Sequence, residues 1–289
     1  MSAGRTDRIV TLHGALVQHG KSNDRVYLMR LEPAGLPDLI PALDALALRH
    51  GYSKIFAKAP ASALPAFRRE GYREEARVPR YFSGKRDGVF LGKYLDPDRA
   101  VPRRNARRRE ALAAALAGAA SAADRPVKRL PSTLTWSEAG SADAEPLARL
   151  FAAVFETYPF PVHDPAFLRR SMKEHAVYGC LRHRGEIVAV SSAEMDAPAR
   201  AAEMSDFAIA PAWRGRGLAR ILLHRMEQAI AGQGVRTAFT IARAVSAPMN
   251  RTFASQGYAF GGTLINNTQI CGRLESMNVW HKPLKANGA

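Results

Sequence analysis

Apolar residues in the first third of the chain recur with two spacings, alternating in some segments and returning every three to four positions in others. Alternation predicts half-buried strands, and the longer spacing predicts amphipathic helices. Strands are expected at residues 8–16, 26–31, 54–57 and 89–95. Helices are expected at 37–51, which carries a stripe of leucines, and at 64–70, where Gly71 is a helix-ending signal.

The part of the chain after residue 133 alternates between the same two patterns. It predicts strands at 134–137, 177–182, 186–194, 201–210 and 237–243, followed by two closing strands. Helices are predicted at 141–157, 166–174, 217–232 and 247–255, and a proline-rich bend lies at 158–165. Strands with interposed helices predict an α/β (α+β) fold, with a mixed, mostly antiparallel twisted sheet flanked by helices.

The length of 289 residues favours two domains. We place an N-terminal domain at 1–98, a basic, alanine-rich linker helix at 99–132 and a second domain at 133–289. Residues 67–72 (FRREGY) and 253–258 (FASQGY) have the same form, and each follows a strand and a short helix. The N-terminal domain is therefore expected to be a degenerate copy of the second.

The formal net charge of +16 raises the alternative of a nucleic-acid-binding protein. The densest basic run, at 103–109, leads directly into an alanine-rich helix, which favours a solvated connector, so nucleic acid is not the expected partner. Only Cys180 and Cys271 are present, with no metal-ligand spacing. We expect no metal, no membrane span and a reducing cytoplasmic location, and a homodimer is left open.

One turn in the second domain has the form of a phosphate-binding cradle. Residues 206–210 end an apolar strand, Pro211 marks a turn, and the sequence Arg214-Gly-Arg-Gly-Leu-Ala219 opens a helix. The glycines allow a tight turn, and a helix N-terminus presents free N–H groups to an anion. Neither the dinucleotide-binding fingerprint nor the P-loop signature is present.

The filled positions Arg214, Gly217 and Ala219, in a strand–turn–helix context, resemble the acetyl-CoA signature of the GNAT-superfamily N-acetyltransferases. The resemblance implies acetyl-CoA as acetyl donor. In many family members a later helix carries an Asn and a Tyr, and those positions fall here on Ser246 and Phe253. Phe253 cannot act as an acid, and Asn250 is the substitute candidate. The cofactor-binding residues expected are Phe207, Ala208, Ile209, Arg214, Gly215, Arg216, Gly217, Leu218, Ala219, Arg220, Ser246, Asn250 and Phe253.

Acetylation of an amine requires a base, because an alkylammonium group has a pKa near 10.4. The acids beside the cradle strand are Glu194, Asp196, Glu203 and Asp206. The position of Glu203 resembles that of the catalytic glutamate in several GNAT enzymes. Glu203 and Asp206 would point to opposite faces of a regular strand, but a bulge would change this, so both remain catalytic candidates.

The closing segment, 261–280, is dense in small polar residues where a strand is normally apolar, which favours a pocket for a small polar substrate. Together with 160–165, 194–196, 203–207, 19–27 and 54–58, it resembles the β-lysine N6-acetyltransferases, which make the compatible solute N6-acetyl-β-lysine. That resemblance implies a small diamino-acid substrate; another amine acceptor (a polyamine, lysine or a protein lysine) or an inactive nucleic-acid-binding fold are alternatives. The expected substrate-binding residues are Phe160, His163, Glu194, Ser205, Asn266, Asn267, Glu275 and Asn278.

Overall fold

The computed structural model describes residues 7–32, 35–122, 129–270 and 272–285. Their strands form a single thirteen-stranded sheet in the order β1-β2-β3-β4-β6-β5-β12-β13-β11-β10-β9-β8-β7. The strands of the N-terminal half are β1 (Arg8–Leu12), β2 (Ala15–Gly20), β3 (Arg25–Arg30), β4 (Lys54–Pro60), β5 (Arg73–Phe82) and β6 (Arg86–Tyr94). Its helices are α1 (Leu36–His50) and α2 (Leu64–Arg69).

The C-terminal half contributes the other side of the sheet. Its strands are β7 (Thr135–Glu138), β8 (Ala176–His183), β9 (Glu186–Asp196), β10 (Ala201–Ile209), β11 (Thr237–Arg243), β12 (Ala259–Ile270) and β13 (Arg273–Pro283). Its helices are α4 (Ala144–Val154), α5 (Pro165–Glu174), α6 (Leu218–Gly232) and α7 (Ala247–Ala254). Helix α3 (Asn105–Ala122) lies between the two halves in sequence. The mixed, mainly antiparallel sheet with flanking helices confirms the predicted fold class.

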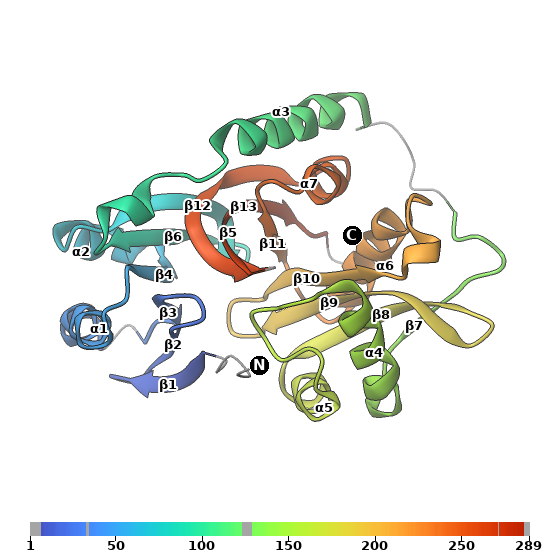
Figure 1. Cartoon of the computed structure of the whole chain (residues 1–289), viewed down its shortest axis with the longest axis horizontal. Helices are drawn as coiled ribbons and strands as arrows, with labels where there is room; N and C mark the ends of the chain where they lie inside the picture. The colour runs from blue at the N-terminus through green and yellow to red at the C-terminus, as the bar shows by residue number, and fades with distance from the viewer. Residues whose placement is uncertain (1–6, 33–34, 123–128, 271, 286–289) are drawn as a thin grey trace.

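The two halves repeat one topology. The order β1-β2-β3-β4-β6-β5 matches β8-β9-β10-β11-β13-β12, and in each half the third and fourth strands are parallel. A long helix, α1 or α6, connects that parallel pair. Strand β5 pairs with β12 where Ala76 meets Gly262, so the halves join edge to edge, with β12 between the blue and the yellow parts of Figure 1. The similar segments at 67–72 and 253–258 lie at corresponding places in the two halves, at the ends of α2 and α7. The domain limits at 98 and 132 stay predictions.

Side chains that alternate along the strands build two different environments. On β3, Val26 and Leu28 pack in the core beneath α1, so Arg25 and Tyr27 face the other way. On β10, Ala202 and Met204 pack beneath α6 and α7, so Glu203 and Ser205 face the opposite side. The faces turned away from these helices meet in a shared core, whose large members include Phe56, Phe90, Phe239, Met277 and Tyr81.

Polar groups close the seam between the halves. Arg99, in a 3-10 turn after β6, is 4% exposed, and its guanidinium donates to the carbonyl oxygens of Asn23 and Asn266. The Asn266 side chain in turn donates to the carbonyls of Arg99 and Val101. The expected linker therefore begins with a residue that is built into the fold, because Arg99 joins the turns before β3 and β4 to β12 through five hydrogen bonds.

Helix α3 differs from the solvated connector that its composition suggested. Ala111 and Ala115 are buried, and the helix packs against α7 along the top of Figure 1. Small alanine side chains allow this close approach, and Leu112 adds apolar contact with the same core cluster. Residues 123–128 of the expected linker lie outside the described residues.

Two other predicted elements have different limits. The strand expected at 8–16 is a hairpin of β1 and β2, because His13 (φ 46°) and Gly14 (φ 77°) form a turn with two positive φ angles. The helix expected at 141–157 continues only to Val154, since Phe155 is already extended. With this extended backbone, Phe155 packs against the core beneath α4, where its ring contacts those of Phe151 and Tyr158.

Candidate active site

The turn before α6 has the geometry of an anion cradle. Gly215 and Gly217 both have φ of 77°, and Gly217 is the N-cap of the fifteen-residue helix α6. No atom of the described residues lies within 4 Å of where a β-carbon on either glycine would stand, so the space in front of the turn is open. Arg214 and Arg216 donate hydrogen bonds to the carbonyl oxygens of residues 209 and 212, the Arg216 guanidinium lies over the Trp213 ring, and both arginines stay exposed.

The remaining cofactor candidates divide into two groups. Phe207, Ala208 and Ile209 end β10 directly before the turn, and Leu218, Ala219 and Arg220 form the first turn of α6. Ser246 precedes α7 as its N-cap residue. Asn250 and Phe253, by contrast, lie inside the fold rather than at an open surface.

Asn250 is fully buried, and its amide is used by the protein. Its nitrogen donates to the carbonyls of Arg243 and Ser246, and its oxygen accepts from Asn278 and Trp280. Phe253 is 1% exposed and makes edge-to-face contacts with the neighbouring rings of Phe207 and Tyr258. These two side chains hold α7 against the sheet, and their contact with a cofactor stays a prediction.

A β-bulge in β10 brings the two candidate bases together. The pairing with β9 shifts register between Ser205 and Ala208, and Asp206 has a left-handed backbone with φ of 53°. The extra residue cancels the alternation of side chains, so Glu203, Ser205 and Asp206 all line one cavity. Glu194, opposite Glu203 on β9, lines the same cavity.

Hydrogen bonds organise this group of acids. The Tyr158 hydroxyl donates to Oδ1 of Asp206 at 2.5 Å, and Ser192 Oγ donates to Oδ2 at 2.7 Å. Ser192 also lies 3.1 Å from Ser205 Oγ, which donates to Glu194 at 3.4 Å. Asp206 is therefore an acceptor held on both oxygens. Tyr158 comes from the proline-rich bend, and the sequence analysis did not identify it.

Burial raises the pKa of all three acids. For Glu203, burial is the main cause, Asp206 adds repulsion, and Lys58 and Arg25 oppose the shift, which leaves a pKa of about 7. Burial and the neighbouring carboxylates Glu203 and Asp206 raise the pKa of Glu194 well above its usual value. Burial also raises that of Asp206, although hydrogen bonds from Tyr158 and Ser192 limit the effect. Glu203 is thus the acid whose pKa suits proton transfer near neutral pH.

The cavity has a volume of about 670 Å³ and lies between the two halves of the sheet. The N-terminal half contributes Arg25 and Tyr27 from β3 and Lys58 from β4. Lys58 Nζ donates to the Tyr81 hydroxyl at 2.9 Å and lies 3.5 Å from Asp196 Oδ2. Arg25, Lys58 and Tyr81 were not among the predicted site residues. Alternation along 25–30 and 54–60 places the charged side chains of Arg25 and Lys58 on the inner face, and this pattern was the signal that could have identified them.

The predicted substrate residues are only partly brought together. Phe160, Glu194, Ser205 and Asn267 line the cavity. His163 is exposed in the turn before α5 and lies outside the cavity lining.

The other three residues from the closing segment are elsewhere. Asn266 bonds to the 99–101 turn, and Asn278 accepts from Thr263 and donates to Asn250. Glu275 is 3% exposed and pairs with Arg104 and Arg243. The polar side chains of this hairpin therefore bond to the 99–101 turn, to α7 and to neighbouring arginines, since buried polar groups need partners.

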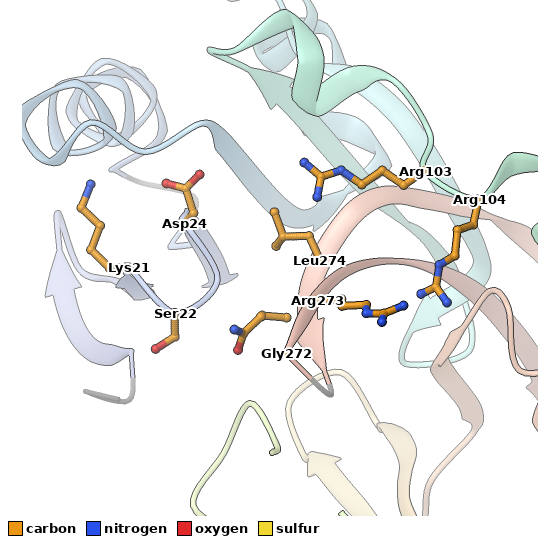
Figure 2. Close-up of a pocket in the computed structure, with 9 residues that line it drawn as sticks. Lys21, Ser22, Asp24, Arg103, Arg104, Gly272, Arg273 and Leu274 are labelled. Carbon is orange, nitrogen blue, oxygen red and sulfur yellow. The ribbon is translucent and has the colours of Figure 1, made fainter. Parts of the chain in front are cut away.

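A second pocket, of about 460 Å³, has the opposite charge (Figure 2). It lies where the loop after β2, the segment before α3 and the β12–β13 turn come together. Its charged lining consists of Lys21, Arg103, Arg104, Arg273 and one acid, Asp24. The cavity beside β10, in contrast, has five carboxylates (Glu174, Glu194, Asp196, Glu203 and Asp206) against Arg25, Arg30 and Lys58. A substrate with two ammonium groups fits the acidic cavity beside β10 and is repelled by the basic pocket.

Within the described ranges, no cluster of three potential metal ligands occurs, and no helix combines the length and apolarity needed to span a membrane. Cys180 is a buried free thiol, and Cys271 lies outside the described residues.

Known proteins are similar to this chain over nearly its whole length. Residues 145–258 match the model of the acetyltransferase (GNAT) family. A beta-lysine N(6)-acetyltransferase of Methanococcus maripaludis is 33% identical over 276 residues, which are 96% of this chain and 98% of the relative. N-acetyltransferase YodP of Bacillus subtilis is 31% identical over 93% of this chain and 96% of its own length. A beta-lysine N(6)-acetyltransferase of Methanosarcina mazei is 29% identical, covering 86% and 97%. The similarity thus extends over the N-terminal half as well as the half that the family model matches.

Proposed function

The chain belongs to the GNAT acetyltransferase family, whose members use acetyl-CoA, and on that premise we propose that it acetylates the N6 amine of β-lysine to give the compatible solute N6-acetyl-β-lysine. The observation that carries this proposal is the placement of Glu194, Glu203 and Asp206 in one cavity of a protein with a net charge of +16. Such a local excess of carboxylates suits an acceptor with two ammonium groups. The naming of two full-length relatives as beta-lysine N(6)-acetyltransferases supports the same acceptor.

We assign the role of general base to Glu203. With a pKa of about 7, its carboxylate is substantially ionised at neutral pH and can accept the proton of the N6 ammonium, directly or through water. Removal of this proton exposes the nitrogen lone pair that attacks the acetyl carbonyl. Asp206 is less suited to the role, because Tyr158 and Ser192 already donate to both of its oxygens.

Glu194 and Asp206 have a supporting role in this proposal. Burial raises the pKa of both acids, and the neighbouring carboxylates raise that of Glu194 further, so both retain protons more readily than exposed carboxylates. A cationic substrate that enters the cavity stabilises their ionised forms. The same interaction orients the amine toward Glu203 and excludes bulk water from the reacting groups.

The turn at 214–219 fits the pyrophosphate of acetyl-CoA, which supplies the acetyl group when bound. The backbone N–H groups at the start of α6 point into open space, and Arg214 and Arg216 are exposed beside them. Positive φ at Gly215 and Gly217 permits this close approach. We assign the cofactor-binding role to residues 207–209 and 214–220, with Ser246 nearby as a further candidate.

An acetyl-transfer assay across acceptors tests the proposal. Purified protein should acetylate β-lysine with a higher kcat/KM than α-lysine, ornithine or spermidine, and mass spectrometry should place the acetyl group on N6. A preference for spermidine would establish a polyamine acetyltransferase instead. No transfer to any amine, combined with salt-dependent binding of nucleic acid, would favour the inactive alternative. A cytoplasmic location and a role in osmoadaptation remain predictions, and a homodimer stays an open alternative.

A further inference from the structure

Arg25 is a buried cation in the wall of the substrate cavity. It is 5% exposed, begins β3, and lies in the N-terminal half, far in sequence from the acids of β9 and β10. Its Nη1 donates to the carbonyl oxygen of Asn267 at 2.5 Å and to Thr268 Oγ1 at 3.1 Å. Its Nε is buried without a hydrogen-bond partner among the described residues. The guanidinium is thus fixed in position, but its Nε donor makes no hydrogen bond to the described residues.

Asn267 is the neighbour of Arg25 in that wall and has the complementary deficiency. It is 1% exposed, its Nδ2 lies 3.5 Å from Thr268 Oγ1, and its Oδ1 is a buried acceptor without a partner in the described part of the chain. The other described residues with such atoms, such as Gln18 and Glu227, do not line the cavity. The two cavity residues, which are joined by the hydrogen bond from Arg25 Nη1 to the Asn267 carbonyl, therefore hold one unsatisfied donor and one unsatisfied acceptor.

Unpaired buried polar groups are uncommon in native proteins, because each has lost its hydrogen bonds to water without a compensating bond in the protein. A ligand that supplies an anionic acceptor for Arg25 and a cationic donor for Asn267 would remove both deficits. A carboxylate next to an ammonium group, the head of an amino acid, has this composition. Guanidinium–carboxylate pairs also have the planar geometry for two parallel hydrogen bonds.

The other cations of the cavity are less suited to the carboxylate. Lys58 is already paired with Asp196 and hydrogen-bonded to Tyr81. Arg30 is exposed at the other end of β3, where water competes for it. Arg25 is the cation of the lining that is both buried and incompletely bonded.

We propose that Arg25 and Asn267 form the amino-acid clamp of the active site, in which Arg25 binds the substrate carboxylate and Asn267 Oδ1 accepts from the adjacent ammonium group. This inference rests on the proposed acetylation of a diamino acid and adds which residues select the substrate class. The clamp and Glu203 line the same cavity, so a substrate held by its carboxylate can offer its far amine to the base. The N-terminal half thereby completes the active site, and polyamines, which lack a carboxylate, are discriminated against.

The first arm of the test uses the unmodified full-length protein and altered substrates. β-Lysine amide replaces the carboxylate by a neutral carboxamide, and 1,4-diaminopentane lacks that group altogether. Loss of a buried, hydrogen-bonded charge pair should lower kcat/KM by about 10²-fold for both, mainly through KM. Equal kcat/KM for β-lysine and its amide would overturn the clamp while leaving the proposed function intact.

The second arm uses variants. Arg25→Met should lower kcat/KM for β-lysine by about 10²-fold but leave that for 1,4-diaminopentane within about threefold, because the deleted interaction is absent there. Arg25→Lys should recover part of the loss, and Arg86→Met, the same change at an exposed site on β6, is the matched control. A uniform loss on both substrates would indicate a structural role and contradict the proposal. If β-lysine is not acetylated at all, the proposed function fails, and calorimetric titration of β-lysine against its amide decides the clamp separately.

Discussion

Glu203 and Asp206 stand three positions apart on one strand, yet both carboxylates line the same cavity. The bulge between Ser205 and Ala208 makes this possible, and the left-handed backbone of Asp206 is its local signature. The consequence is electrostatic as well as geometric, because each acid opposes ionisation of the other. The Tyr158 hydroxyl and Ser192 bind Asp206, so the two carboxylates differ in availability although they share one environment.

Glu203→Gln should lower kcat for β-lysine by about 10²–10⁴-fold at pH 7, because the amide cannot accept the ammonium proton. Raising the pH should recover part of this loss, since more free amine is then present. Steady-state kinetics between pH 6 and 9 provide the measurement. The unmodified protein should show a limb in kcat/KM near pH 7, where Glu203 loses its proton, and the variant should lack it.

Asp206→Asn is the matched control for this assignment. It keeps the side-chain shape and one acceptor oxygen for Tyr158 or Ser192, so a smaller loss in kcat is expected. Full activity of Glu203→Gln together with inactivity of Asp206→Asn would transfer the base role to Asp206.

The same acid should make stability depend on pH. Glu203 has a pKa of about 7 in the folded protein and 4.5 as its ordinary value, so the folded state holds the proton more tightly. Its ionisation therefore costs stability as the pH rises from about 4.5 to about 7, and the whole penalty is present above pH 7. Glu203→Gln should raise the free energy of unfolding by about 1–3 kcal/mol at pH 8 and have little effect at pH 4.5. Denaturant titration at both pH values measures this, and equal changes at both would contradict the burial of Glu203.

Gly217→Glu should abolish binding of CoA. A carboxylate at the N-cap of α6 would occupy the open space that the phosphates need and repel them. Gly185→Glu is the control, because Gly185 also has a positive φ, of 87°, and open space around it, but lies in the β8–β9 turn. Isothermal titration with CoA should show loss of binding only for Gly217→Glu. Retained binding in that variant would remove the cradle assignment.

The parts of the fold that were predictable depend on local sequence. The cradle is a strand, a glycine turn and a helix N-terminus within about fifteen residues, and each piece has its own signal. The repeated order of strands was anticipated from the echo at 67–72 and 253–258. The β1–β2 turn at His13 and Gly14 was also a local signal, but apolar and polar residues alternate across it, so the sequence predicted one continuous strand there.

The cavity could not be assembled from local patterns. Arg25, Tyr158 and Asn267 come together only because the two halves of the sheet meet, and their separations in sequence exceed a hundred residues. Glu275 shows a second limit of local patterns. Its acidic side chain in a polar hairpin suggested substrate binding, and only the fold reveals that basic residues at 104 and 243 reach it from other elements. Polar residues at a seam and polar residues in a pocket have the same composition, and only the tertiary partners distinguish them.

The seam itself should be sensitive to one buried ion pair. Lys54 Nζ lies 2.7 Å from Glu75 Oε2 and also donates to the carbonyl of Ile265 on β12, and burial lowers the pKa of Lys54 to about 8. Lys54→Met would leave the Glu75 carboxylate buried beside Tyr94 without its cation, which should cost about 3–5 kcal/mol in the free energy of unfolding. Adding Glu75→Gln should restore part of that loss, because the uncompensated charge is then removed. Urea denaturation of both single variants and the double variant measures the coupling. If the double variant loses the sum of the two single losses, the two residues do not act as a pair, and the seam depends on its backbone hydrogen bonds instead.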